Sequence, residues 1–203
     1  MIFVCAIIIA YCIGAIPTGI IFCRILKGTD PRSIGSKSMG ATNVARVLGY
    51  KWGVFVLFID ILKGYLPVVL LAPVMFAPEQ LELGKVLIGA AAVSGHVWTI
   101  FAGFRGGKGV GTAAGVLLAL DWPSVLVCLG IWLIIFIAFR IVSLASMGAA
   151  IAFPMLIWLS GGRSMELKIA SIIFALFLIY THRTNIARLI AGTEFTPFDR
   201  ETP

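Results

Sequence analysis

Long apolar stretches alternate with short polar segments along the chain, and most of these stretches are long enough to cross a bilayer. About 20 apolar residues in a helix span the hydrocarbon core, and a helix satisfies its own backbone hydrogen bonds there. The candidate crossings are residues 1–23, 52–77, 86–104, 110–120, 122–139, 141–160 and 167–181. The pattern predicts an all-α polytopic membrane protein with about seven transmembrane helices, built as a single domain over residues 1–203.

The stretch over residues 110–120 is short for a crossing, since Asp121 follows it directly. Gly111 and Gly115 give it the GxxxG spacing that lets membrane helices approach one another closely. A short, glycine-rich turn at residues 103–109 joins it to the third helix. It is either a thin, closely packed crossing or a broken one.

Positive charges favour a crossing there and predict the orientation. With the N-terminus outside and this stretch crossing, only Lys85, Arg163 and Lys168 of the 16 lysines and arginines fall on the outer side. One further lysine, Lys63, lies inside a crossing. Membrane proteins carry an excess of positive charge on the cytoplasmic side. We therefore expect an external N-terminus and a cytoplasmic C-terminus.

The same topology places three polar segments on the cytoplasmic side, at residues 27–51, 103–112 and 182–194. The middle one, GFRGGKGVGT, sets Arg105 and Lys108 among several glycines. Glycine amides can converge on an anion, both cations bind phosphate oxygens, and the N-terminus of the following helix favours the same charge. The segment predicts a phosphate-type ligand. The alternative is a tight turn whose cations only follow the topology.

The first and third polar segments add groups suited to a phosphorylated ligand. The side chains of interest are Ser36, Asn43 and Arg46 in the first segment and His182, Asn185 and Arg188 in the third. The last three recur at helical spacing and can present one polar face. A basic helix that binds anionic lipid headgroups is the alternative interpretation of the third segment.

Three ionisable residues fall inside predicted crossings, where charge is costly. Asp60 and Lys63 stand three residues apart, on one helical face, so they can pair and turn inward. We interpret them as an ion pair that holds helices together, with a direct role toward substrate as the alternative. His96 lies within a few helical turns of Lys108 and either faces the same site or is a hydrogen-bonded structural residue.

Composition narrows the class of protein. Hydrophobic residues make up 60% of the chain and the net charge is +7, which in a membrane protein reports orientation and anionic partners. No basic, aromatic-interleaved soluble segment indicates nucleic-acid binding, and no obligate protein partner is predicted. Cys5, Cys12, Cys23 and Cys128 have no paired spacing, and carboxylates do not cluster, so we expect no metal and no cofactor.

The three polar segments resemble those of the bacterial acyl-phosphate:glycerol-3-phosphate acyltransferases, integral membrane enzymes of phospholipid synthesis. The strings that carry the resemblance are IGSKSMGATNVARVLG (34–49), GHVWTIFAGFRGGKGVGT (95–112) and THRTNIARLIAGTE (181–194), together with IDILKGYLP and VSLAS. Two departures stand out. Lys37-Ser38 replace the family's usual Gly-Asn, and Thr99 stands where a proline is usual.

The resemblance implies a seven-helix fold in the bacterial cytoplasmic (inner) membrane, with the motifs facing the cytoplasm. It implies transfer of an acyl chain from acyl phosphate to the 1-hydroxyl of sn-glycerol 3-phosphate, giving lysophosphatidate and inorganic phosphate, without acyl-CoA. No serine or cysteine stands beside an obvious base, so direct attack without an acyl-enzyme is expected. A transporter of a phosphorylated metabolite is the competing class, although no internal repeat is visible.

The resemblance also suggests roles for the polar residues. Lys108, His182 and Ser36 are the expected catalytic residues. The expected substrate-binding residues are Asn43, Arg46, His96, Arg105, Gly106, Gly107, Gly109, Thr112, Asn185 and Arg188. Among them, the loop amides and Lys108 are assigned to the acyl-phosphate headgroup. The general base stays open between His182, His96 and the phosphate of the substrate itself.

Overall fold

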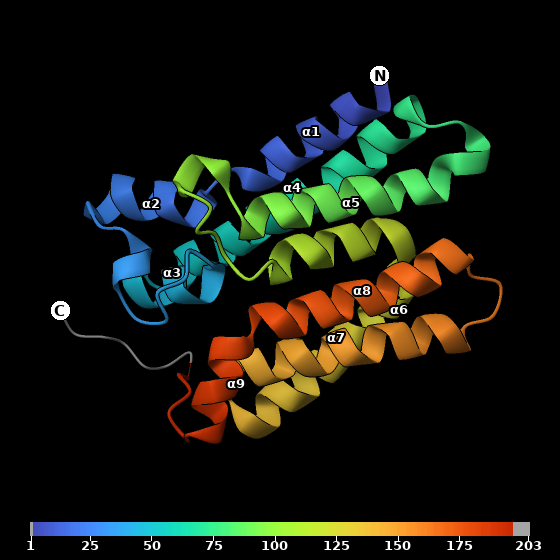
Figure 1. Cartoon of the computed structure of the whole chain (residues 1–203). Coiled ribbons are helices and arrows are strands. Elements are labelled where there is room, and N and C mark those ends of the chain that lie inside the picture. Colours follow the sequence, from blue (N-terminus) through green and yellow to red (C-terminus); the bar gives the residue numbers. More distant parts are fainter. Residues whose placement is uncertain (1, 197–203) are drawn as a thin grey trace.

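The computed structural model describes residues 2–196, and this part of the chain is helical without strands (Figure 1). The helices are α1 (Ile2–Ala15), α2 (Thr18–Lys27), α3 (Ala41–Leu48), α4 (Tyr50–Met75), α5 (Leu81–Val97), α6 (Val110–Phe139), α7 (Val142–Leu159), α8 (Met165–Thr181) and α9 (Arg183–Ile190). Three short 3-10 turns, Pro31–Ser33, Pro78–Gln80 and Ile100–Ala102, lie in the connections. The predicted all-α class is confirmed.

Several of these helices have the length and hydropathy of membrane crossings. Five stretches of the described chain qualify, or six if α8 and α9, which meet at a bend of 57°, form one span. Many large apolar side chains on them are exposed, for example Val74 at 76% and Leu159 at 84%, as lipid-facing residues are. The protein is therefore an integral membrane protein, while seven crossings and an external N-terminus stay predictions.

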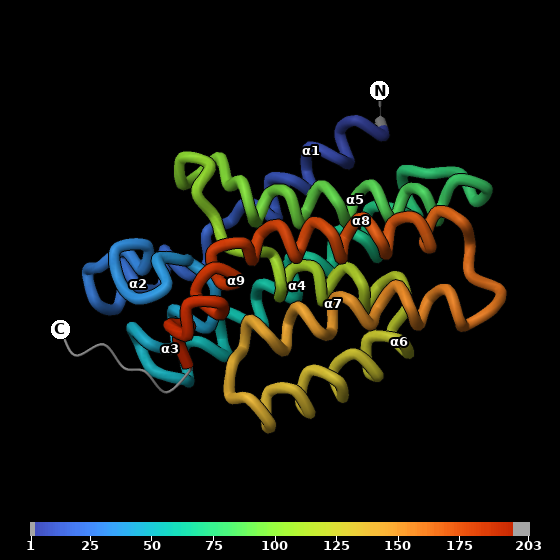
Figure 2. Tube along the Cα trace, turned by 60° about the horizontal axis from the view of Figure 1, so that its bottom comes forward, coloured from blue at the N-terminus to red at the C-terminus, as the bar shows by residue number. Residues whose placement is uncertain are grey.

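The predicted boundary between two crossings at Asp121 is a break inside α6. Asp121 has φ −155° and ψ 79°, outside the helical region, and its carboxylate accepts a hydrogen bond from the Ser124 N–H at 3.3 Å. It thereby caps the second half of α6, and Pro123 fits there because the first turn of a helix does not need its N–H. The two halves, 110–120 and 122–139, run in opposite directions (Figures 1 and 2).

The predicted first crossing is also interrupted, since α1 ends at Ala15 and α2 begins after Pro17. Proline cannot donate the backbone hydrogen bond that would continue the helix, which leaves carbonyls of the last turn of α1 without partners. The Thr99 hydroxyl donates to the carbonyl of Ala15, and Lys63 Nζ donates to that of Ile16 at 3.0 Å. Thr99, a departure from the family pattern, therefore stabilises the break.

Close helix contacts follow the small residues that the sequence indicated. A Cβ on Gly115 would overlap the carbonyl of Ile61 in α4, and one on Gly64 would overlap the carbonyl of Thr112 in α6. The predicted GxxxG contact is thus confirmed, with α4 as its partner. The first half of α6 is held in the middle of the bundle, in front of α4 and beside α5 (Figure 1).

The three polar segments meet at one end of the bundle. The connection from α2 to α3, the loop before α6 and helix α9 all lie at the left in Figure 1, whereas the α4–α5 and α7–α8 connections lie at the opposite end. The chain crosses the bundle repeatedly and returns its positively charged segments to the same end, as the distribution of lysine and arginine predicts. This convergence creates the candidate site.

Candidate active site

A cavity of about 470 Å³ opens where the three polar segments meet. Its walls differ in chemistry from one end to the other. The polar wall includes Ser36, Ser38, Asn43, Arg46, Lys108, Ser143, His182, Asn185 and Glu194, and the apolar wall includes Val54, Leu57, Ile61, Val110, Ala114, Leu129 and Trp132. Such a cavity suits a ligand with an anionic head and a hydrocarbon tail.

Lys108 is half-buried at the polar wall, two residues before α6 begins. Its backbone carbonyl accepts a hydrogen bond from the Thr181 hydroxyl at 3.0 Å, which ties the loop to the end of α8. Burial lowers the pKa of the Lys108 ammonium to about 8, with Glu194 opposing the shift and Arg188 and Arg46 adding to it. The ammonium therefore gains from any anion that replaces lost water.

Two backbone amides of the glycine loop, which the sequence analysis assigned to an anion, instead donate hydrogen bonds to carbonyls of the protein itself. The N–H of Gly106 donates to the carbonyl of Val97 at 3.0 Å, and that of Gly107 to the carbonyl of His96 at 3.1 Å. These two amides are therefore not free for a phosphate, contrary to expectation. Glycine is needed because a Cβ at either position would overlap His96. Of the predicted glycines, Gly109 lines the cavity.

Three other predicted binding residues lie outside the cavity wall. Arg105 is exposed, and its carbonyl accepts a hydrogen bond from Arg32 Nη1 at 3.2 Å. Thr112 is fully buried on the face of α6 that meets Gly64. Arg188 is absent from the wall itself, but its Nε contacts the carboxylate of the wall residue Glu194 at 2.8 Å. The helical spacing of His182, Asn185 and Arg188 thus brings the first two to the cavity wall and the third behind it.

Asn43 shapes the first polar segment from within. Its Oδ1 accepts from the Ser36 N–H at 3.1 Å, and its Nδ2 donates to the carbonyls of Pro31 and Ser38 at 2.7 and 2.8 Å. The side chain is 1% exposed, so the loop is wrapped around it. The fold of this loop places Ser36 at the cavity, with Lys37 in the left-handed region at φ 54°, where the family's usual glycine fits without strain.

Glu194 is a cavity residue that the sequence analysis did not select. Its carboxylate accepts hydrogen bonds from Asn185 Nδ2 at 2.6 Å, Arg188 Nε at 2.8 Å and the Ser143 hydroxyl at 3.1 Å. The available signals were the glutamate at the end of the THRTNIARLIAGTE motif and the first serine of VSLAS. Their pairing depends on the chain turning back after α9, which spacing alone does not predict.

Phe195, the residue after Glu194, is in contact with two arginine side chains. The Phe195 ring lies between two guanidinium groups, with Arg46 and Arg188 each 5.3 Å from its centroid. Arg46 also donates to the carbonyl of Thr196 at 3.0 and 3.3 Å. Cation–π contacts of this kind hold the two guanidinium groups against the ring. The segment after α9 therefore covers the polar end of the cavity.

His182 is held in one tautomer by its own helix. Its Nδ1 lies 2.8 Å from the carbonyl of Leu178, and because a carbonyl can only accept, Nδ1 carries the proton. In the neutral ring, Nε2 is then the acceptor nitrogen. The ring is 2% exposed and belongs to the cavity wall. The orientation of the imidazole ring is therefore set by helix α8.

The intramembrane acid, lysine and histidine form one cluster. Asp60 Oδ1 lies 2.8 Å from Lys63 Nζ and 3.8 Å from His96 Nδ1. The predicted Asp60–Lys63 ion pair is confirmed, and Lys63 also holds the break after α1. Asp60 and His96 belong to the cavity wall, but His96 is packed against Gly107. The cluster thus joins α4, α5 and the glycine loop beneath the polar end.

Replacing Asp60 by alanine is expected to destabilise the protein by about 3–5 kcal/mol, because it leaves the buried Lys63 ammonium without its counter-charge. Thermal unfolding in detergent measures the change. The partly exposed pair Glu82–Lys85, also three residues apart at 2.6 Å, is the matched control, and Glu82→Ala should cost about 1 kcal/mol or less. Removing both charges with Asp60→Ala and Lys63→Met should recover part of the loss. An Asp60→Ala melting curve like that of Glu82→Ala would contradict the structural role.

Fold and site together define an integral membrane protein with a cavity at one end of a helical bundle, lined by cationic, polar and apolar side chains. Among the described residues, no group of three or more His, Cys, Asp and Glu side chains could hold a metal ion. The chain belongs to the glycerol-3-phosphate acyltransferase family, whose model matches residues 4–192.

Named relatives and solved structures align with this chain over nearly its full length. A glycerol-3-phosphate acyltransferase of Chlorobium phaeobacteroides is 43% identical, covering 92% of each chain, and one of Fusobacterium nucleatum is 42% identical, covering 96% of this chain and 97% of the relative. The crystal structure of PlsY (YgiH), an integral membrane glycerol 3-phosphate acyltransferase, in its glycerol 3-phosphate form is 37% identical. It covers 96% of this chain and 94% of its own, with a TM-score of 0.86. Its lysophosphatidic acid form gives a TM-score of 0.83.

Proposed function

We propose that this protein transfers an acyl chain from acyl phosphate to the 1-hydroxyl of sn-glycerol 3-phosphate, giving lysophosphatidate and inorganic phosphate. The single observation that carries the proposal is the cavity itself, because a cationic wall and a hydrocarbon wall meet within one space. Both an acyl phosphate and lysophosphatidate combine a phosphate with a fatty chain. The relatives' names and the two ligand forms of PlsY support the same acceptor and product.

The proposal includes the placement of the enzyme. It is a single domain in the bacterial cytoplasmic membrane, and its cavity faces the cytoplasm, where glycerol 3-phosphate is dissolved. The gathering of Arg46, Lys108 and Arg188 at one end of the bundle supports this orientation. The acyl donor then enters with its tail in lipid and its phosphate at the interface.

Lys108 is proposed to bind the acyl-phosphate headgroup and the negative charge that develops on the reacting carbonyl oxygen. It supplies a cation at the junction of the polar wall and the apolar wall formed by Val110 and Ala114. Such a charge acts strongly where water is excluded. Gly109 lets the chain pass close to Val93 and Val97 on the way into α6, so that the backbone before the helix can approach the headgroup.

Glycerol 3-phosphate is proposed to bind between the first and third polar segments. Arg46 and Ser36 would bind its phosphate from one side, with Asn43 acting through the shape of the loop. On the other side, two buried atoms within the described chain have no hydrogen-bond partner, Asn185 Oδ1 and Arg188 Nη2. A buried acceptor and a buried donor beside Glu194 are suited to a hydroxyl and a phosphate oxygen.

The reaction proposed is direct attack. The 1-hydroxyl oxygen forms a bond to the acyl carbon, the bond from that carbon to the phosphate oxygen breaks, and phosphate leaves with the bonding pair. The hydroxyl proton passes to Nε2 of His182, whose tautomer makes that nitrogen the acceptor. His96 is less suited, because its Nε2 is packed against Gly107. The phosphate of the substrate is the remaining alternative base.

The pH dependence of the reaction should report the Lys108 charge. Since burial lowers its pKa to about 8, the free enzyme loses the ammonium as pH rises through that value. We expect kcat/KM for the acyl donor to fall about tenfold per pH unit above about pH 8. A bound phosphate favours the charged form, so kcat should fall only at higher pH. Measuring both constants between about pH 6 and 10 tests this, and a flat kcat/KM through about pH 9 would contradict it.

A transporter and an enzyme make different predictions for purified protein. With acyl phosphate and labelled glycerol 3-phosphate, the enzyme forms labelled lysophosphatidate only when both substrates are present. A transporter forms no product and instead accumulates the label in proteoliposomes. Product formation without uptake is the expected result, and uptake without product would overturn the proposed function.

A further inference from the structure

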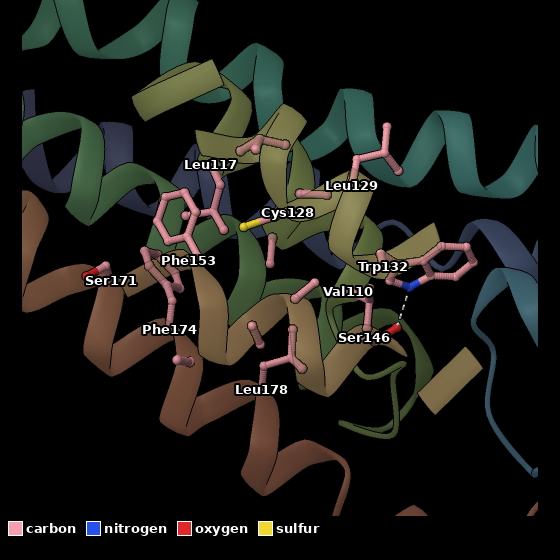
Figure 3. A pocket seen from close by; sticks show the side chains of 16 residues that line it. Val110, Leu117, Cys128, Leu129, Trp132, Ser146, Phe153, Ser171, Phe174 and Leu178 are labelled. Carbon is pink, nitrogen blue, oxygen red and sulfur yellow. Dashed lines mark hydrogen bonds between the residues drawn. The ribbon is translucent and has the colours of Figure 1, made fainter. Parts of the chain in front are cut away.

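A second cavity of about 150 Å³ lies among the two halves of α6, helix α7 and helix α8 (Figure 3). Its side chains come from all four helical segments, and those that shape its far end are Leu117, Val125, Cys128, Phe153 and Phe174. Figure 3 shows the Cys128 side chain directed into the space between Leu117 and Phe153. None of these residues was used by the site described above.

The wall of this second cavity is apolar, even at its two serines. The Ser171 hydroxyl donates to the carbonyl of Lys168 at 2.7 Å, so it offers little to a ligand. The Ser146 hydroxyl donates to the carbonyl of Val142 at 2.8 Å and accepts from Trp132 Nε1 at 3.2 Å, as the dashed line in Figure 3 shows. An apolar cavity of this size stays dry and accepts a hydrocarbon of roughly six carbons, the size of benzene.

The second cavity adjoins the first, and the two share part of their wall. The residues that line both are Val110, Ala114, Leu129, Trp132 and Ser146. Val110 stands two residues after Lys108, and Leu117 stands about two turns further along the same helix half, so the path from the shared wall to the far end is about 10 Å. A chain whose phosphate contacts Lys108 is thus led along α6 into the second cavity.

We propose that the second cavity receives the distal end of the acyl chain, and that Cys128 and Phe174 determine how long a chain the enzyme accepts. This inference rests on the proposed function, since it assigns the tail of the same donor. Apolar contact is the discriminating term: because the tail enters from lipid, which is as apolar as the cavity, each methylene that fits gains the closer packing of the protein wall. Methylenes that find no room lose that contribution.

Two substitutions should shift the chain-length profile in opposite directions. Cys128→Phe fills the cavity and should lower the ratio of kcat/KM for sixteen-carbon over eight-carbon acyl phosphate by at least about tenfold, with the eight-carbon value nearly unchanged. Phe174→Ala enlarges the far end and should move the optimum toward longer chains. The matched control is Cys5→Phe, the same exchange at an exposed position of α1, which should leave the ratio as in wild type.

The outcomes separate this inference from the function on which it rests. Wild-type protein that transfers neither chain would overturn the proposed donor and the inference together. Wild-type transfer with the same chain-length ratio in Cys128→Phe, Phe174→Ala and wild type would overturn the inference alone. If Cys128→Phe does not fold, Cys128→Leu in the same assay should give a smaller shift of the same sign, and an unchanged ratio there would also overturn it.

Discussion

Replacing Lys108 by alanine is expected to lower kcat/KM by about 10²–10³, the effect of removing one charge-stabilising donor from an active site. The ammonium is half-buried at the point where the polar and apolar walls of the cavity meet. It is therefore next to the acyl carbon of any donor whose phosphate and tail follow those two walls. Steady-state rates of phosphate release, measured with each substrate varied in turn, give the change.

Arg105 supplies the matched control for Lys108. It is a cation of the same loop, but it is exposed and outside the cavity wall. Arg105→Ala should keep kcat/KM within about threefold of wild type, since exposed charges contribute little once screened. A loss below tenfold for Lys108→Ala would contradict its assignment. Equal losses for both variants would show that the loop acts by general positive charge.

Replacing His182 by alanine is expected to lower kcat by about 10²–10⁴, the usual contribution of a positioned general base. Its Nδ1 is fixed on the Leu178 carbonyl, which leaves Nε2 to accept a proton from the acceptor hydroxyl. KM for glycerol 3-phosphate should change much less, because the phosphate is held by other side chains. In wild type, protonation of Nε2 should lower kcat at acidic pH, and this acidic limb of the pH profile should be absent in the variant, since no imidazole remains to be protonated.

The His96→Ala variant tests whether this second imidazole acts as a base or only supports the structure. His96 belongs to the same cavity wall, yet it contacts the Asp60–Lys63 pair and packs against Gly107. His96→Ala should reduce the melting temperature and leave the acidic limb of the pH profile in place. Near-normal rates for both histidine variants would assign proton removal to the phosphate of the substrate.

The lengths of the apolar stretches and the distribution of lysine and arginine predicted much of the fold. Both are local properties, because a helix in lipid satisfies its own backbone and a charge near its end sets its direction. The break at Asp121 and the close contact made by Gly115 could also be predicted, because each depends on residues that are close together in the sequence. The break at Pro17 was missed in the sequence analysis, since the apolar pattern continues across it.

The interior of the site was less predictable, because it depends on contacts between distant segments. The sequence supplied Gly106 and Gly107 as anion ligands, but the preceding helix places the carbonyls of Val97 and His96 within reach of their amides. Glu194 enters the site only because the chain turns back after α9. Asn43 lines the cavity, but its hydrogen bonds to its own loop could not be foreseen from spacing.

The measurement that tests the central claim most directly compares two acyl donors on the same purified protein. Acyl phosphate or acyl-CoA of equal chain length is supplied with glycerol 3-phosphate, and inorganic phosphate, free thiol and lysophosphatidate are followed together. Equal amounts of lysophosphatidate and phosphate from acyl phosphate, abolished in Lys108→Ala, with acyl-CoA inert, are the predicted result. Lysophosphatidate formed from acyl-CoA with release of thiol, and none from acyl phosphate, would contradict the account.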